Sequence, residues 1–188
     1  MPADLRPAVF FDRDGTLMEE VHYCADPALV RIFPGIPESL RCLKQAGFAV
    51  FVVTNQSGIG RGLMTEAQYQ AVSAEFLRQA GPGSVDASYY CPDPPDVASP
   101  CRKPNPGMVL AAAAVHHIDL TASYFVGDKD IDVECGRRAG TRTVLVLTGY
   151  GRQQECPADL VCEDANEAVR RILGELGAAG PPARPSLV

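Results

Sequence analysis

The stretch Val9–Thr16, which reads VFFDRDGT, passes directly from an apolar run to two carboxylates one residue apart. A short aliphatic and aromatic run of this kind, followed by Gly15, predicts a buried central strand. In an α/β sheet the carboxyl ends of the strands open onto the ligand crevice, so Asp12 is expected at its floor. Alternation along an extended backbone places Asp12 and Asp14 on the same side, with Arg13 pointing away.

Two carboxylates so close together repel each other unless a cation or a shared proton lies between them. A divalent metal is therefore the expected third member of the group formed by Asp12 and Asp14. Gly15 lets the chain turn at once, and Thr16 offers a hydroxyl to the loop. The same residues would also suit a strand end capped by turn-forming Asp, and this stretch alone does not separate the two interpretations.

Length and composition place the chain among ordinary globular proteins. Its 188 residues fit one domain, and 46% apolar with 21% charged residues is typical of a globular fold. A net charge of −6 argues against a nucleic-acid or membrane partner, and no run has the pattern of a membrane span or a secretory signal. Seven scattered cysteines, an odd number, favour a reducing compartment, so we predict a cytoplasmic protein.

Apolar runs alternate with helical patterns along the chain. Strands are predicted at Ala8–Phe11, Phe48–Val53, Val85–Tyr90, Tyr124–Val126 and Thr143–Leu147, and helices at Ile36–Lys44, Thr65–Ala80, Gly107–His117 and Ile131–Ala139. This alternation predicts right-handed βαβ units and an α/β fold with a doubly wound, Rossmann-like parallel sheet, in one domain over residues 1–176. Residues 177–188, rich in Gly, Ala and Pro, have the composition of a disordered tail.

Residues suited to phosphate chemistry follow four of these strands. They are, strand by strand, Asp12 and Asp14, Thr54 and Asn55, Arg102 and Lys103, and Asp128. Because parallel strands end at the same edge of a sheet, we expect these groups to form one site. Together they supply what phosphoryl transfer needs: a nucleophile, a proton donor, cations for the phosphoryl oxygens and a hard ligand for Mg²⁺.

The order and spacing of these residues resemble the haloacid dehalogenase superfamily of phosphotransferases. Its first motif, DxDG[TV], is matched at Asp12–Thr16, and its three later motifs are matched at Thr54, Lys103 and Asp128. Within the superfamily, the chain is similar to the small branch without a cap domain that hydrolyses heptose bisphosphates and histidinol phosphate. The branch signals are TNQSGIGRG at Thr54–Gly62, CRKP at Cys101–Pro104 and PGM at Pro106–Met108, within a resemblance that covers about Ala8–Gly149.

The resemblance implies a mechanism in two steps. Asp12 would be the nucleophile that forms an aspartyl-phosphate, and Asp14 would be the general acid and base. Thr54 and Lys103 would hold the phosphoryl group. Mg²⁺ would be bound by Asp12, the backbone carbonyl of Asp14, and Asp128. The implied substrate-binding residues, in which Arg102 suits bidentate contact with a second phosphate, are Glu20, Val21, His22, Tyr23, Asn55, Gln56, Ser57, Arg102 and Lys129.

The implied substrate is a small phosphorylated sugar, and the TNQSG string favours the 7-phosphate of D-glycero-D-manno-heptose 1,7-bisphosphate. A histidinol-phosphate phosphatase, with the same chemistry on another alcohol, is the first alternative. A non-catalytic phosphate- or nucleotide-binding module is the second, although the presence of both Asp12 and Asp14 argues against it. A phosphotransferase with an acceptor other than water is the third. The chain is expected to act as a monomer, and the sequence does not choose between the sugar anomers.

Members of this branch often hold a structural zinc ion through the spacing CxH…CxC. Here Cys91 and Cys101 remain, but Asp93 stands at the histidine position and Ser99 at the third cysteine position. A structural zinc is held by four N or S ligands, so this set predicts no zinc. The prolines of the same segment are expected to supply stiffness instead.

Overall fold

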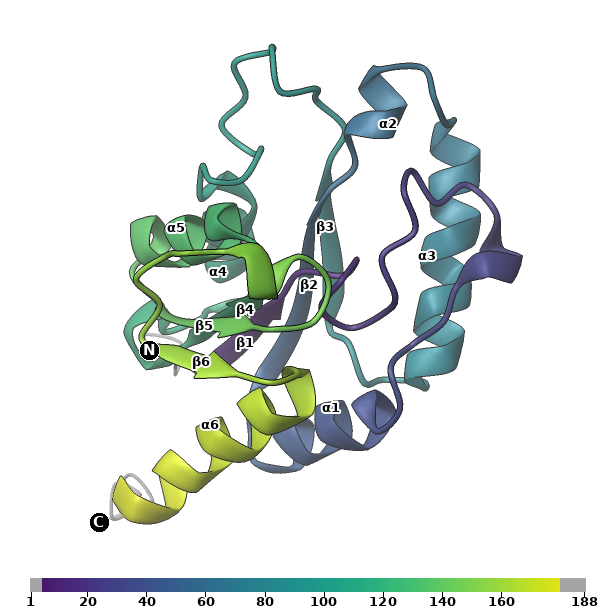
Figure 1. Ribbon diagram of the computed structural model, residues 1–188. Coiled ribbons are helices and arrows are strands. Elements are labelled where there is room, and N and C mark those ends of the chain that lie inside the picture. Colours follow the sequence, from purple (N-terminus) through teal and green to yellow (C-terminus); the bar gives the residue numbers. More distant parts are fainter. Residues whose placement is uncertain (1–4, 180–188) are drawn as a thin grey trace.

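The computed structural model describes residues 5–179, in which six parallel strands form one sheet (Figure 1). The strands are β1 (Ala8–Phe11), β2 (Ala49–Asn55), β3 (Ala87–Cys91), β4 (Tyr124–Gly127), β5 (Arg142–Val146) and β6 (Leu160–Cys162). Their order is β3-β2-β1-β4-β5-β6. The chain first adds β2 and β3 on one side of β1, and then adds β4, β5 and β6 on the other side. The order reverses between β1 and β4, where α/β sheets open a ligand crevice. The predicted doubly wound α/β fold is confirmed.

Helices cover both faces of the sheet. One face carries α1 (Ile36–Gln45), α3 (Glu66–Ala80) and α6 (Ala165–Ala179), and the other carries α4 (Gly107–His116) and α5 (Asp130–Ala139). Each face has its own apolar core, because successive residues of a strand point to opposite sides. Val9 and Phe11 belong to the first core, whereas Phe10 belongs to the second.

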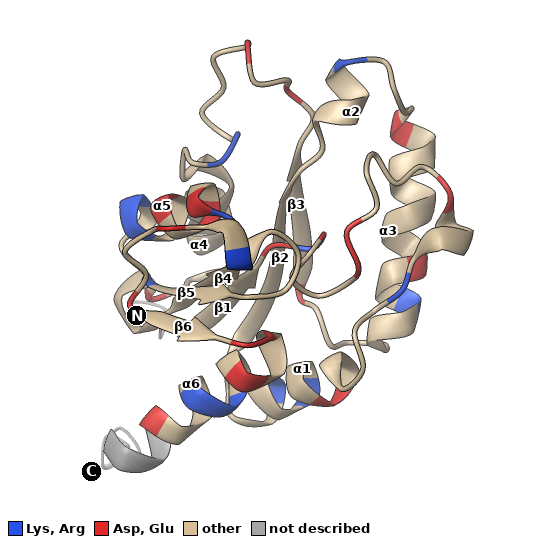
Figure 2. Ribbon diagram, in the orientation of Figure 1, with Lys and Arg blue, Asp and Glu red and all other residues tan. Residues whose placement is uncertain are grey.

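Strand β1 contributes to both cores, and all its residues are fully buried. The Phe10 ring lies between Phe51 of β2 and Phe125 of β4, with ring centroids 5.2 and 6.5 Å away. Figure 2 shows that charged residues lie mostly on helices and connecting loops rather than on strands. Arg142, at the exposed start of β5, is the exception among the strands of residues 5–179.

The C-terminal part differs most from the prediction, because the sequence predicts neither β6 nor α6. β6 is a three-residue edge strand with an exposed Val161, so it lacks the apolar run that marks a buried strand. α6 packs one stripe, which includes Val169 and Ile172, onto the first core. It also extends over 177–179, the start of the expected tail, because alanine is a strong helix former. Residues 180–188, the rest of that tail, lie outside the described residues.

Short elements complete the connections. They are α2 (Ser57–Gly60) and the 3₁₀ helices Pro27–Leu29, Leu120–Ala122 and Gly151–Gln153. α2 begins just after β2, so the predicted TNQSG string forms the junction between this strand and a single helical turn. Among residues 5–179, none of the helices combines the length and the apolar character that crossing a membrane requires.

We expect Phe10→Ala to lower the free energy of unfolding by about 3–5 kcal/mol, because it removes a fully buried ring from between two others. Urea unfolding followed by circular dichroism measures the change. The control is Leu110→Ala on α4, whose side chain is 46% exposed and whose loss should cost less than about 1 kcal/mol. Equal losses in the two variants would contradict the central position of Phe10.

Candidate active site

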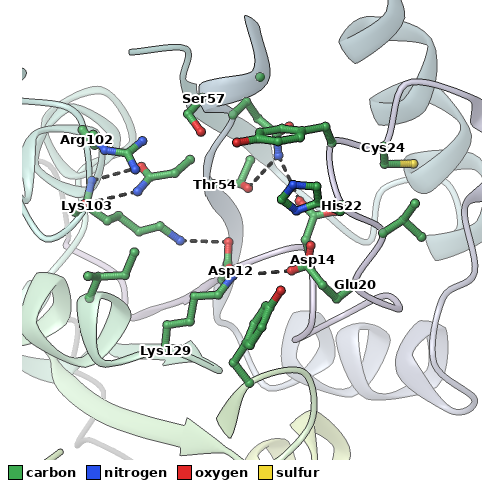
Figure 3. Close-up of a pocket in the computed structure, with 17 residues that line it drawn as sticks. Asp12, Asp14, Glu20, His22, Cys24, Thr54, Ser57, Arg102, Lys103 and Lys129 are labelled. Atoms are coloured by element: carbon green, nitrogen blue, oxygen red, sulfur yellow. Dashed lines mark hydrogen bonds and ion pairs between the residues drawn. The ribbon is translucent and has the colours of Figure 1, made fainter. Parts of the chain in front are cut away.

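A cleft of about 320 Å³ opens at the carboxyl ends of the central strands, and loops far apart in the sequence converge on it (Figure 3). It is lined by every predicted catalytic and substrate-binding residue, namely Asp12, Asp14, Glu20, Val21, His22, Tyr23, Thr54, Asn55, Gln56, Ser57, Arg102, Lys103 and Lys129. Four further lining residues are Cys24, Gly58, Ile131 and Tyr150. The predicted metal ligand Asp128 is fully buried and does not line the cleft itself.

Lys103 is the buried cation at the centre of this site. Its Nζ lies 2.8 Å from Oδ1 of Asp12 and 2.7 Å from Oδ1 of Asp132, and it donates a hydrogen bond of 2.9 Å to the Val53 carbonyl oxygen. Burial would lower the pKa of Lys103, but the two carboxylates raise it above its ordinary value. Asn55 holds the Lys103 backbone, accepting from its N–H at 3.0 Å and donating to its carbonyl oxygen at 3.2 Å. The ammonium group is therefore fixed and charged.

Asp12 is buried and yet ionised. Burial acts to raise the pKa of its carboxyl group, but the charges of Lys103 and Lys129 bring the pKa below its ordinary value. The Asp12 N–H donates to the Val126 carbonyl oxygen at 2.9 Å, which continues the pairing of β1 with β4 beyond the strand end. The carboxylate is thus presented to the cleft from a fixed backbone and without a proton, as a nucleophile requires (Figure 3).

The carboxylates of Asp12, Asp128 and Asp132 form a buried cluster, each with an oxygen within 4.8 Å of one on the others. Within the described residues, Oδ1 of Asp128 has no hydrogen-bond partner. Burial and the neighbouring charge of Asp12 raise the pKa of Asp128 to about 7. A hard divalent cation with oxygen ligands would satisfy the free oxygen and offset the excess negative charge. The donor set therefore fits Mg²⁺.

Asp132 is a charged residue of this site that the sequence analysis missed. It lies in the first turn of α5, four residues after Asp128, so the helix brings it back beside the strand end. Its Oδ2 accepts a hydrogen bond of 3.1 Å from the Lys129 N–H. Burial raises the pKa of Asp132 to about 6, although Lys103 acts to lower it. Two acids spaced by one helical turn at a strand-to-helix junction are the signal that could have revealed it.

Two glycines allow the chain to pass close to Asp128. Gly15 and Gly149 have φ angles of +84° and +52°, and a Cβ atom on either would overlap the Asp128 carboxylate. Beside them, the Tyr150 N–H donates to Oδ2 of Asp128 at 2.8 Å. The turn at Gly149 therefore packs directly on the acidic cluster.

Arg13 does not line the cleft that Asp12 and Asp14 line, as the alternation predicts, but its side chain contacts Asp14, which the alternation does not predict. Its guanidinium is buried and contacts Oδ2 of Asp14 through Nε at 3.1 Å and Nη2 at 3.0 Å. Gln56 Nε2 donates to the same oxygen at 2.9 Å and to Oγ1 of Thr54 at 3.0 Å. The alternation of side chains ends with β1 at Phe11, and the turn after it returns Arg13 to Asp14. Asp14 is therefore held by two donor residues.

The loop after β1 supplies one wall of the cleft. Glu20 on this loop forms an ion pair with Lys129, with Oε2 and Nζ 3.4 Å apart. The Lys129 ammonium lies 4.6 Å from the centroid of the Tyr150 ring, a favourable cation–π distance. Tyr23 has a φ of 50° and lies against Gly58, where any Cβ would collide with its ring. The predicted substrate loop thus reaches the end of β2.

The two cysteines that remain of the zinc pattern are Cys91, the last residue of β3, and Cys101, in the segment between β3 and α4. Sγ of Cys91 lies 3.1 Å from Sγ of Cys101, and Oδ2 of Asp93 lies 3.6 and 3.8 Å from them. Oγ of Ser99 lies 3.5 and 3.0 Å from the same sulfurs. Cys91, Asp93 and Cys101 are close enough to share an ion. Two thiols, a carboxylate and a hydroxyl still do not make the four N or S ligands of a structural zinc site.

Known proteins are similar to this chain in sequence and in fold. A family model described as HAD-hydrolase-like matches residues 100–168. The D-glycero-beta-D-manno-heptose-1,7-bisphosphate 7-phosphatase of Salmonella typhi is 38% identical over 183 residues, which are 92% of this chain and 94% of that protein. The D-glycero-D-manno-heptose-1,7-bisphosphate 7-phosphatase of Chlorobaculum tepidum is 35% identical over 89% of this chain and 94% of its own length.

A solved structure extends the similarity to three dimensions. It is the D,D-heptose 1,7-bisphosphate phosphatase from B. bronchiseptica complexed with magnesium and phosphate, which superposes with a TM-score of 0.83 at 33% identity. The match covers 90% of this chain and 99% of that one. The chain therefore belongs to the haloacid dehalogenase-like phosphatases, as its four motifs predict. It is an enzyme of the class that hydrolyses phosphate monoesters.

Lys103→Met should destabilise the protein by about 3–5 kcal/mol at pH 7, because it leaves Asp12 and Asp132 buried without their cation. Without Lys103, burial raises the pKa of both carboxyl groups above their values in the unfolded chain. Such groups cost stability as the pH rises, so the loss relative to wild type should shrink between pH 7 and pH 5. Urea unfolding at the two pH values measures both effects.

The matched control is Arg171→Met, which breaks an exposed ion pair with Glu167 on α6. This variant should lose less than about 1 kcal/mol at either pH, because water screens the pair. A loss in Lys103→Met that is as small as this, or that does not change with pH, would contradict the buried ion pairs of Lys103.

Proposed function

We propose that this protein is a Mg²⁺-dependent phosphatase that removes the 7-phosphate of D-glycero-D-manno-heptose 1,7-bisphosphate through an aspartyl-phosphate intermediate. The observation that carries the proposal is Asp12, a buried, ionised carboxylate that faces a cleft beside two lysines and an acidic cluster. The two relatives named as heptose-1,7-bisphosphate 7-phosphatases support the choice of substrate.

Asp12 is assigned the role of nucleophile. Its carboxylate attacks phosphorus, the sugar oxygen leaves, and water then hydrolyses the aspartyl-phosphate, so that one difficult step becomes two. The charges of Lys103 and Lys129, which keep Asp12 ionised, support this assignment. Lys103 and Thr54 would contact the oxygens of the transferred group, where charge needs to be stabilised.

Asp14 is assigned the two proton transfers. It lines the cleft two residues after Asp12, and Arg13 and Gln56 fix the direction of its carboxyl group. In the first step it would donate a proton to the leaving sugar oxygen. In the second it would accept a proton from the attacking water.

Asp12, Asp128 and the backbone carbonyl of Asp14 would hold Mg²⁺, with Asp132 adjacent. The bound ion would offset the negative charges of the phosphoryl group and of the carboxylates. The unpartnered Oδ1 of Asp128 among the described residues and the raised pKa of Asp128 support the assignment. The magnesium and phosphate in the similar B. bronchiseptica structure are consistent with it.

Arg102 and Lys129 are the cations assigned to the second phosphate of the substrate. Both line the cleft, and Arg102 is anchored because its Nη1 donates to the Asp93 carbonyl oxygen at 2.9 Å. A guanidinium group can contact a phosphate through two parallel hydrogen bonds, which would favour a bisphosphate over a monophosphate. The Glu20–Tyr23 loop would contact the sugar, and a cleft of about 320 Å³ suits a small molecule.

We further propose that the enzyme works as a monomer in the cytoplasm. Seven scattered cysteines, an odd number, support a reducing compartment. A cleft that one domain forms without a second catalytic domain supports a monomer.

Phosphate release with Mg²⁺ tests the function on both anomers of heptose 1,7-bisphosphate and on histidinol phosphate. We expect rapid release of one phosphate from the heptose, loss of activity in EDTA, and recovery when Mg²⁺ is restored. Faster turnover of histidinol phosphate would overturn the substrate assignment and retain the chemistry. Release from none of the three would overturn the proposed function.

In the same assay, Asp12→Asn should lower kcat by about 10⁴-fold or more, because the amide keeps the shape of the side chain but is not a nucleophile. Circular dichroism should show an unchanged fold. The matched control is Asp130→Asn, an exposed carboxylate outside the cleft, which should keep kcat within about twofold of wild type. Substantial turnover by a folded Asp12→Asn variant would remove Asp12 from the role of nucleophile.

Arg102→Ala should raise KM for the bisphosphate by about 10–100-fold, the value of one or two charge-assisted hydrogen bonds. KM for the monophosphate p-nitrophenyl phosphate should change by less than about threefold. Arg152→Ala is the control, because Arg152 is exposed and pairs with Glu163 outside the cleft. If Arg102→Ala impairs both substrates equally, Arg102 does not recognise the second phosphate.

A further inference from the structure

Two thiols face each other in the segment that leads into the active site. Cys91 ends β3, and Cys101 directly precedes Arg102 and Lys103. Their sulfurs lie 3.1 Å apart, although both residues are free cysteines. In the described part of the chain, which contains all seven cysteines, this is the one pair with its sulfurs in contact. The proposed phosphatase mechanism does not use either thiol.

We propose that Cys91 and Cys101 form a thiol modification site. They react with a low-molecular-weight disulfide, such as oxidised glutathione, and become joined by an intramolecular disulfide bond. The site is separate from the phosphate chemistry, so the proposal stands whichever phosphorylated substrate the enzyme takes.

The backbone on both sides fixes the distance between the sulfurs. Cys91 is anchored in β3, where its carbonyl oxygen accepts from the Gln56 N–H at 2.7 Å. The segment before Cys101 is anchored by Asn105, whose side chain donates to the Ser99 carbonyl oxygen at 2.8 Å. Oγ of Ser99 also accepts from the Arg102 N–H at 3.3 Å. The two thiols are therefore brought together by the fold and not by free rotation of a loop.

The groups around the sulfurs favour thiol chemistry over a metal ion. Asp93 and Ser99 stand where the zinc pattern has a histidine and a cysteine, and each contacts both sulfurs. A carboxylate and a hydroxyl are hard oxygen ligands, which bind soft, thiolate-preferring ions poorly. The two sulfurs are in contact, but the nitrogen and sulfur ligands that would complete a metal site with them are replaced by oxygen groups.

The reaction balances with one disulfide as oxidant. Cys101 is half-buried, so its thiolate attacks one sulfur of oxidised glutathione, forms a mixed disulfide and releases one glutathione thiolate. The Cys91 thiolate then attacks the Cys101 sulfur and releases the second. Two cysteine thiols are oxidised, one glutathione disulfide is reduced, and the two cysteine protons pass to the two leaving thiolates. Burial raises the pKa of Cys91 to about 11, so the second step should accelerate with rising pH.

The bond would close the segment on which the catalytic lysine depends. It joins the end of β3 to the residue before Arg102, and Lys103 comes next in the chain. A cross-link restricts the unfolded chain and preserves a segment that is already in place in the folded one. The oxidised protein should therefore unfold at a higher temperature than the reduced protein.

Trypsin makes the test direct, because residues 79–102 form one tryptic peptide that holds Cys91 and Cys101 and no other cysteine. The full chain is equilibrated with reduced and oxidised glutathione, blocked with N-ethylmaleimide and digested without reduction. We expect this peptide to lack two hydrogen atoms and to carry no maleimide, whereas Cys42 on α1 remains alkylated. Treatment with dithiothreitol should restore two maleimide sites.

Single variants identify the thiols and provide the controls. Cys91→Ser should leave Cys101 as a mixed disulfide with glutathione, and it should abolish the rise in unfolding temperature on oxidation. Cys42→Ser should leave both the cross-link and that rise unchanged. Two maleimides on residues 79–102 in a buffer that oxidises dithiothreitol would overturn the proposal. So would one equivalent of zinc, found by elemental analysis of the purified protein and bound by these thiols.

Discussion

The ion pairs of one buried lysine, Lys103, make it possible to bury several carboxylates in this active site. Asp12, Asp128 and Asp132 place three carboxylates within 4.8 Å of one another, and like charges of this density are unstable without a counter-charge. Lys103 contacts two of them, while Asp128 keeps an oxygen without a partner among the described residues. The fold thus neutralises part of the charge by itself and leaves the remainder for a cation. Charge balance, more than shape, therefore supports the proposed metal site.

This charge balance depends on the order of the strands. Asp12 comes after β1, which lies between β2 and β4, so groups from both neighbours can reach it. Lys103 comes from the segment after β3 and lies over the end of β2, where Val53 and Asn55 hold it. Asp132 comes from α5, after β4. Each partner arrives from a different side of the central strand, which explains why a doubly wound sheet suits this chemistry.

The sequence predicts the residues that end strands and fails for those whose position depends on a turn or on the start of a helix. Asp12, Thr54 and Asp128 follow continuous apolar runs, so their place at the sheet edge can be derived from patterning alone. The contact of Arg13 with Asp14 depends on a turn, and the position of Asp132 depends on where α5 begins. Neither the turn nor the start of the helix is marked by a pattern of apolar residues in the sequence. β6 is not predicted for the same reason, since half-exposed edge strands lack continuous apolar runs.

The segment from β3 to α4 shows how hydrogen bonds can hold a loop beside an active site. This segment positions Lys103 beside Asp12, and a displacement of the segment would leave buried carboxylates unpaired. Any means of holding the segment serves that purpose: a metal, a network of hydrogen bonds, or a covalent bond. In this chain Ser99 and Asp93 hydrogen-bond to the remaining sulfurs, so the segment is held without the missing ligands. These hydrogen bonds hold the two thiols beside each other, which is the arrangement on which the proposed disulfide depends.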